Sequence, residues 1–180
     1  MKKIVWTCGL FAGLISSSLF IALMLLGKAQ MTHFKHGMIY GYTLMLLAFS
    51  LIFVATRIVR DKQNGGVISF GQAFKIGFYI TLIASTVYVG VWLIDYYAFN
   101  PDFAEKYSAQ MLDQMKASGA SEQEIAKETA RMASFAQMYK NPLFVILLTY
   151  VEILPPGLLI SLISAWILRR KTAGTVSVAV

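Results

Sequence analysis

The sequence predicts an all-α integral membrane protein, a four-helix bundle with an extramembrane helical hairpin between spans three and four. Apolar residues make up 57% of the 180-residue chain and charged residues only 14%, unlike an ordinary soluble domain. Four apolar segments each reach the roughly 20 residues that cross a ~30 Å hydrocarbon core as a helix. They are residues 4–26, 37–59, 70–99 and 143–168. We expect one membrane domain over residues 1–171 and a disordered tail over residues 172–180.

The first apolar segment follows Lys2 and Lys3 and therefore resembles a secretory signal. It is longer than the 7–15 apolar residues of a signal peptide, and residues 27–30 make a poor cleavage site. We interpret it as an uncleaved span. Cys8 is the single cysteine, which excludes a disulfide within the chain and favours a small buried packing residue.

Turn and capping signals mark where span three begins and ends. Residues 61–66 form a polar, glycine-containing turn cluster, and Ser69 and Gln72 have the spacing of a capping box. The span should therefore begin near residue 70. It should end before Pro101, because proline disfavours the helical conformation in the residue that precedes it. About thirty residues exceed the bilayer thickness, so this helix should tilt or project.

Residues 101–140 are predicted to form a periplasmic αα-hairpin. An apolar side chain recurs every four residues in the first helix, at Phe103, Tyr107, Met111 and Met115, and Gly119 should end that helix. Ser121 and Glu124 form a second capping box. The second helix carries Ile125, Met132, Phe135 and Tyr139 on one side and ends at Asn141-Pro142. This stripe packs on the span ends or serves as a partner-binding surface or lid.

The basic residues predict the orientation of the spans. If the four spans alternate, one side receives Lys2, Lys3, Arg57, Arg60, Lys62, Lys75, Arg169, Arg170 and Lys171. The other side receives Lys28, Lys35 and the hairpin, in which acids outnumber bases. Basic residues in short loops collect on the cytoplasmic side, so the prediction is a multi-pass protein of the bacterial inner membrane with both termini cytoplasmic. Anionic lipid headgroups are the expected counter-charge. No basic face with interleaved aromatics indicates a nucleic-acid partner.

Several motifs resemble the domain of unknown function 4199 family of bacterial membrane proteins. They are Gly66 with Ser69-Phe70-Gly71-Gln72-Ala73-Phe74, Asp102-Phe103 with Tyr107, Gly119-x-Ser121-x-x-Glu124-Ile125, Tyr139-x-Asn141-Pro142, Glu152-Ile153-x-Pro155-x-Gly157 with Ala165, and Arg169-Arg170-Lys171. The resemblance covers nearly the whole chain to about residue 171. It implies a small multi-span inner-membrane protein for which neither an activity nor catalytic residues are established.

One carboxyl, Glu152, lies inside the fourth apolar segment, and a charge at that depth normally has a partner, a proton or a role. It is sixteen residues, or roughly 24 Å, from Leu168. Hydroxyl groups at a similar depth complete a candidate intramembrane polar site: Thr149, Thr86, Ser85, Tyr88, Thr43 and Ser17. Three readings remain open, namely a protonated structural acid, a proton relay or transport group, and a catalytic or ligand-capturing group.

Pro155, Pro156 and Gly157 predict a helix break directly after Glu152. Broken spans often line ion or substrate sites, whereas a kink can also serve only to fit neighbouring helices. Two further glycine pairs, Gly9 with Gly13 and Gly37 with Gly41, permit close helix contact inside the chain or between two copies.

Other chemistry has little support in the sequence. His33 and His36 lack a third ligand, so no metal site, cofactor or catalytic residue is assigned. No nucleotide-binding or hydrolase motif is present, which disfavours an enzyme without excluding one. The leading hypothesis is a structural or interaction subunit of the cell envelope, with membrane lipids and an envelope protein or a second copy as partners. The alternatives are a small oligomeric carrier or proton-coupled channel that uses Glu152, and a lipid-binding protein or membrane enzyme.

Overall fold

The computed structural model describes residues 1–25 and 37–170, and these residues form six α-helices. The helices are α1 (Lys2–Leu25), α2 (Gly37–Ile58), α3 (Phe70–Ile94), α4 (Phe103–Ala117), α5 (Glu122–Tyr139) and α6 (Pro142–Leu168). The predicted all-α class is confirmed for this part of the chain. The expectations for residues 27–30, His33, His36 and the tail 172–180 concern residues outside the described ranges.

Four of the helices are long and apolar enough to cross a membrane, over Lys2–Leu25, Ile39–Gln63, Phe70–Phe99 and Pro142–Leu168. These ranges lie close to the four predicted segments. Two of them include a π-helical turn, Val59–Gln63 after α2 and Asp95–Phe99 after α3. The second span therefore runs a few residues beyond the predicted end at residue 59.

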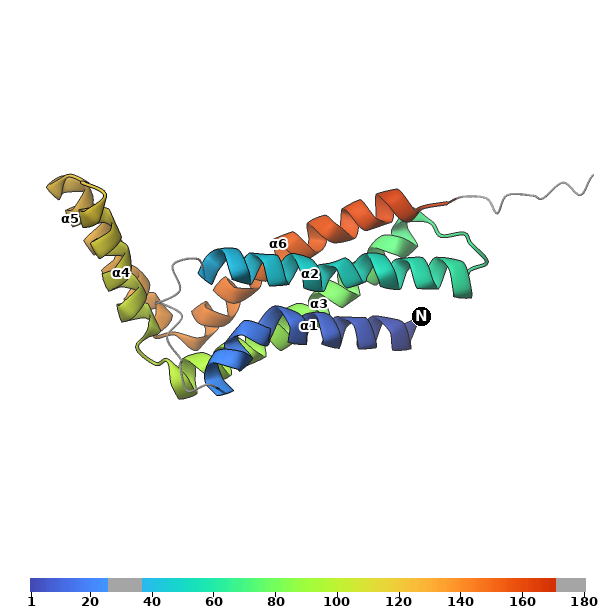
Figure 1. Ribbon diagram of the computed structural model, residues 1–180, viewed down its shortest axis with the longest axis horizontal. Coiled ribbons are helices and arrows are strands. Elements are labelled where there is room, and N and C mark those ends of the chain that lie inside the picture. The colour runs from blue at the N-terminus through green and yellow to red at the C-terminus, as the bar shows by residue number, and fades with distance from the viewer. Residues whose placement is uncertain (26–36, 171–180) are drawn as a thin grey trace, which may run out of the picture.

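Figure 1 shows α1, α2, α3 and α6 lying along one another, with α4 and α5 as a hairpin at one end. The N-terminus and the end of α6 lie at the opposite end of the molecule. Because the hairpin projects away from the long helices, it contacts them mainly at its base.

Local hydrogen bonds produce the predicted helix boundaries. The Ser69 hydroxyl accepts from the Gln72 N–H at 3.2 Å, and the Ser121 hydroxyl accepts from the Glu124 N–H at 3.3 Å; both capping boxes are complete. At the start of α6, the Asn141 side chain accepts from the Leu143 N–H at 3.0 Å. Each cap satisfies a backbone donor that has no partner within its helix.

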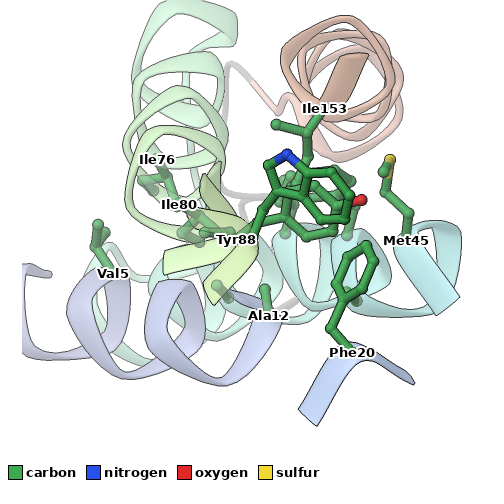
Figure 2. Packing of buried hydrophobic residues seen from close by; sticks show 14 of the residues in the cluster. Val5, Ala12, Phe20, Met45, Ile76, Ile80, Tyr88 and Ile153 are labelled. Carbon is green, nitrogen blue, oxygen red and sulfur yellow. The ribbon is translucent and has the colours of Figure 1, made fainter. Parts of the chain in front are cut away.

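The core of the long helices is a set of apolar side chains that point toward one another from four directions. Figure 2 shows Phe20 of α1, Met45 of α2, Tyr88 of α3 and Ile153 of α6 among them. All four are at most 8% exposed. Burial between helices is therefore concentrated on one stripe of each helix, and the opposite stripes face outward.

Glycines allow the close approach of α1 and α3. A Cβ added to Gly9 would lie 2.8 Å from Ile83, and one added to Gly13 would lie 2.6 Å from Val87. Gly41, by contrast, has no heavy atom within 4 Å of such a Cβ. Of the predicted glycine contacts, the one in α1 is therefore used inside the chain, while Gly41 is not at a close contact.

An aromatic cluster joins the base of the hairpin to the end of α3. The rings of Trp92 and Phe103 meet edge to face at 4.8 Å, and those of Tyr96 and Tyr139 meet at 5.3 Å. The Tyr96 hydroxyl donates to the Tyr139 carbonyl at 3.3 Å. The predicted apolar stripe thus packs on the ends of the long helices at the hairpin base.

Candidate functional site

Glu152 lies on the side of α6, where its side chain is exposed while its neighbour Ile153 is completely buried. Within residues 1–25 and 37–170, its carboxyl forms no hydrogen bond or ion pair. A negative charge on Glu152 would act electrostatically on two tyrosine hydroxyls, those of Tyr88 and Tyr139. Burial raises the pKa of Tyr139, the Trp92 indole opposes this shift, and a negative Glu152 adds to it. Glu152 therefore lies within α6, ten residues after Pro142, and is open to the outside of the helices.

Three of the predicted hydroxyl groups are satisfied within their own helices. Thr43 donates to the Ile39 carbonyl at 2.7 Å, Thr86 to the Leu82 carbonyl at 2.8 Å, and Thr149 to the Val145 carbonyl at 2.7 Å. Thr43 and Thr86 are exposed, and Thr86 also pairs with the Tyr150 hydroxyl at 3.0 Å. None of these hydroxyl groups hydrogen-bonds to Glu152, because the carbonyl one turn back is the nearest acceptor for a helical threonine.

Ser17, Ser85 and Tyr88 are buried in the core rather than at the flank of α6. The Ser17 and Ser85 hydroxyls are fully buried and have no hydrogen-bond partner among the described residues. The Tyr88 ring packs edge to face on Phe20 at 5.5 Å. A charge on Glu152 would act on the Tyr88 hydroxyl, but no hydrogen bond joins Glu152 to the predicted polar groups among the described residues. Equal depth along the bundle did not imply contact, since the rotation of α6 turns Ile153 inward and Glu152 outward.

The predicted break at Pro155, Pro156 and Gly157 is wrong, because α6 runs without interruption from Pro142 to Leu168. A continuous helix lets backbone N–H and carbonyl groups bond to one another in apolar surroundings, where each unsatisfied group costs several kcal/mol. The two prolines still lack N–H groups, so the carbonyls of Val151 and Glu152 lose their helix donors. This turn of α6 therefore carries one carboxyl and two carbonyls that need donors from elsewhere.

Gly157 is a contact point rather than a hinge. A Cβ added there would collide with the Thr81 side chain and would lie 2.8 Å from Cζ of Phe49. One turn further on, the Ser161 hydroxyl lies 3.3 Å from that of Thr81 and donates to the Gly157 carbonyl at 2.7 Å. The close approach of α6 to α2 and α3 is therefore built on this glycine.

Thr81 and Ser161 form a hydroxyl pair that was not predicted from the sequence, and both residues are completely buried. Thr56, on α2, is also completely buried and its hydroxyl has no partner among the described residues. A signal was present, since Gly77 and Thr81 on α3, like Gly157 and Ser161 on α6, are small residues four apart. In the two described ranges, no three His, Cys, Asp or Glu side chains come close enough to hold a metal ion.

Fold and site together define an all-helical protein with four helices able to cross a membrane and a carboxyl on the side of the fourth. The chain belongs to the family described as Protein of unknown function (DUF4199), which matches residues 7–170. This agrees with the resemblance noted in the sequence. Comparison with curated proteins gives no match, and neither does comparison with solved structures.

Proposed function

We propose that the protein is a four-span subunit of the bacterial inner membrane that associates with another membrane-embedded component of the cell envelope. The contact is made by the side of α6 that carries Glu152. The observation that supports this proposal is the exposure of the Glu152 carboxyl on α6, beside the Val151 and Glu152 carbonyls that lack helix donors.

Energetics favour a partner at this position. An ionised acid at the centre of a span costs about 2.5–3.5 kcal/mol on insertion scales, and a neutral acid still needs hydrogen bonds. Hydrogen bonds between spans contribute about 0.6 kcal/mol each on average. A neighbouring helix that offers donors would satisfy the three polar groups together, which the surrounding lipid chains cannot do.

The surroundings of Glu152 on α6 favour association over a water-filled pathway. Leu147, Val151 and Leu159 lie at intervals of four and eight residues along the outer face and are 55%, 67% and 58% exposed. A helix face with apolar side chains around one polar group is suited to contact with another helix in the membrane. A pathway for a polar solute would require more polar groups along this face.

The proposal is tested by variants of Glu152 in a tagged protein extracted in mild detergent. Glu152→Gln retains hydrogen bonding and should retain the partner, whereas Glu152→Leu should lose most of it. Thr43→Val is the matched control, since Thr43 is an exposed polar residue already bonded to its own helix. Equal recovery of the partner by Glu152→Leu and wild type would refute the proposal.

A photo-crosslinking amino acid identifies what touches this face. Placed at position 151, it should form an adduct that the same amino acid at Leu10, 45% exposed on α1, does not form. An adduct between two copies of the chain would identify a homo-oligomer, and an adduct with another protein would identify an envelope partner. Lipid adducts alone at position 151 would contradict a protein partner.

We further propose that both termini are cytoplasmic and the hairpin is periplasmic. The proposal rests on the basic residues near the span ends and on the position of the hairpin opposite the N-terminus and the end of α6 (Figure 1). Gly65 and Gly119 have positive φ, so cysteines are better placed at the neighbouring Asn64 and Ser118, with Cys8 replaced. In intact cells, an impermeant thiol reagent should label position 118 and spare position 64; the opposite result would invert the topology.

A second candidate function is a small oligomeric carrier or proton-coupled channel that uses Glu152. It is favoured by the electrostatic effect that a charge on Glu152 would have on the Tyr88 hydroxyl. It is also favoured by the buried hydroxyl of Ser85, one turn from Tyr88, which has no hydrogen-bond partner among the described residues. Glu152→Gln separates the two functions because glutamine cannot titrate. A subunit role predicts that this variant complements a deletion strain, whereas a relay role predicts a folded, partner-bound protein that fails to complement.

A further inference from the structure

At the end of the molecule opposite the hairpin, basic residues from two separate spans are held together. α2 and the turn that follows it contribute Arg57 and Arg60, and the chain after α6 contributes Arg170. An antiparallel bridge fixes this last residue: the Ile68 N–H donates to the Arg170 carbonyl at 3.2 Å, and the Arg170 N–H donates to the Ile68 carbonyl at 2.9 Å. The cluster is therefore a product of tertiary structure and not of one basic stretch of sequence.

A single acid, Asp61, contacts two of these guanidinium groups, those of Arg57 and Arg60. Its carboxylate accepts from Arg60 through two nitrogens, at 2.6 and 3.1 Å, and lies 3.6 Å from Nε of Arg57. Arg170 is close enough for its charge to act on the same carboxylate. Three positive charges against one negative charge leave a surplus of two.

The three arginines are not equivalent. Arg60 is only 12% exposed, is paired with Asp61, and approaches the Leu168 carbonyl at 3.5 Å, so it ties α2 to the end of α6. The Arg57 side chain is 65% exposed and makes only the longer contact to Asp61. Arg170 is also exposed. Arg57 and Arg170 can therefore bind an additional anion while Arg60 and Asp61 hold the scaffold.

We propose that Arg57 and Arg170 form a binding site for the phosphate group of an anionic phospholipid. Guanidinium groups bind phosphate oxygens in pairs, and these two lie at the ends of α2 and α6, where the headgroups of a membrane would be. Exposed apolar side chains follow directly toward the middle of the helices, at Val54 on α2 and Trp166 on α6, which are 45% and 64% exposed. Tryptophan favours this interfacial level, and acyl chains would lie on these side chains below the phosphate. The proposal does not depend on Glu152 or on the proposed partner.

Lipid retention by the purified detergent-solubilised protein tests this proposal. Native mass spectrometry would count bound lipid after addition of phosphatidylglycerol or phosphatidylcholine at equal concentration. Wild type should retain phosphatidylglycerol roughly tenfold better, and the double variant Arg57→Gln, Arg170→Gln should lose most of this preference. The single variant Arg57→Gln breaks only one long ion pair and keeps the site testable if the double variant does not fold.

The matched control removes two positive charges from the same side of the membrane without touching the cluster. Lys2 and Lys75 are exposed, and the variant Lys2→Gln, Lys75→Gln should keep the preference. Equal loss in this control would show that diffuse charge attracts the lipid and would overturn a defined site. Displacement of the lipid by the same concentration of soluble glycerol phosphate would assign the site to a free phosphate and overturn the lipid assignment.

Discussion

Replacing Gly157 by alanine tests the close packing of α6 against α2 and α3. The added Cβ would collide with Thr81 and lie 2.8 Å from Phe49, and both of these residues are completely buried. Buried side chains in a close-packed core have little room to move. Inserting a methyl group into such a core costs typically about 1–3 kcal/mol.

Alanine also has a favourable effect, because glycine inside a helix is less stable than alanine by about 0.5–1 kcal/mol. The expected net result for Gly157→Ala is a destabilisation of about 1–2 kcal/mol. For a chain of this size, that corresponds to a fall in Tm of roughly 2–8 °C, on a scale derived from soluble proteins.

The matched control is Gly90→Ala, also in a long helix, since nothing lies within 4 Å of a Cβ at Gly90. Its stability should be unchanged or slightly higher. Both variants are compared with wild type by thermal unfolding in detergent, followed by size-exclusion chromatography. If Gly157→Ala proves as stable as Gly90→Ala, the close packing of α6 on α2 and α3 is refuted.

The hairpin supports two further predictions. Phe135→Asp should destabilise the hairpin, because the half-buried Phe135 ring packs against Tyr139 at 4.9 Å. The expected cost is about 2 kcal/mol, roughly half that of removing a fully buried ring. Limited proteolysis should then cut between α4 and α5, and an unchanged cleavage pattern would contradict the packing. Hydrogen bonds from the Ser121 side chain and backbone N–H hold the pKa of the Glu124 carboxyl below its ordinary value, so this stabilisation is present above the ordinary pKa and lost as the pH falls through the lowered one. Hydrogen exchange in the first turn of α5 should therefore show weaker protection below about pH 4. Ser121→Ala, at a cost of about 1 kcal/mol, should reduce that pH dependence without abolishing it, because the bond from the backbone N–H of residue 121 remains. An undiminished dependence in Ser121→Ala would assign it to another group.

Helix boundaries could be predicted from the sequence because their causes are local. The Ser69 and Ser121 caps act on residues three positions away in the same chain, and Pro142 follows its own cap, Asn141, directly. Such hydrogen bonds form in the same way whatever the rest of the fold does. The four apolar helices follow from composition alone, since length and hydrophobicity decide whether a helix can cross a membrane.

The candidate site was predictable only in part. Depth along a span follows from the 1.5 Å rise per residue, and the predicted polar site rested on that depth alone. Contact also requires the rotation of each helix about its axis. Thr43 and Thr86 therefore bond to their own helices and lie on exposed surfaces, although they were predicted to join the polar site.

The sequence by itself determined which segments are helices, where the capped helices begin, and which carboxyl lies within an apolar span. Only the tertiary structure decided that Gly157 is a packing contact, that Glu152 faces outward, and that Arg170 is bridged to Ile68. The physical reason is the range of the interactions. Capping and hydrophobicity act within a few residues, whereas helix rotation is set by close contacts between residues far apart in the chain, such as Thr81 and Gly157.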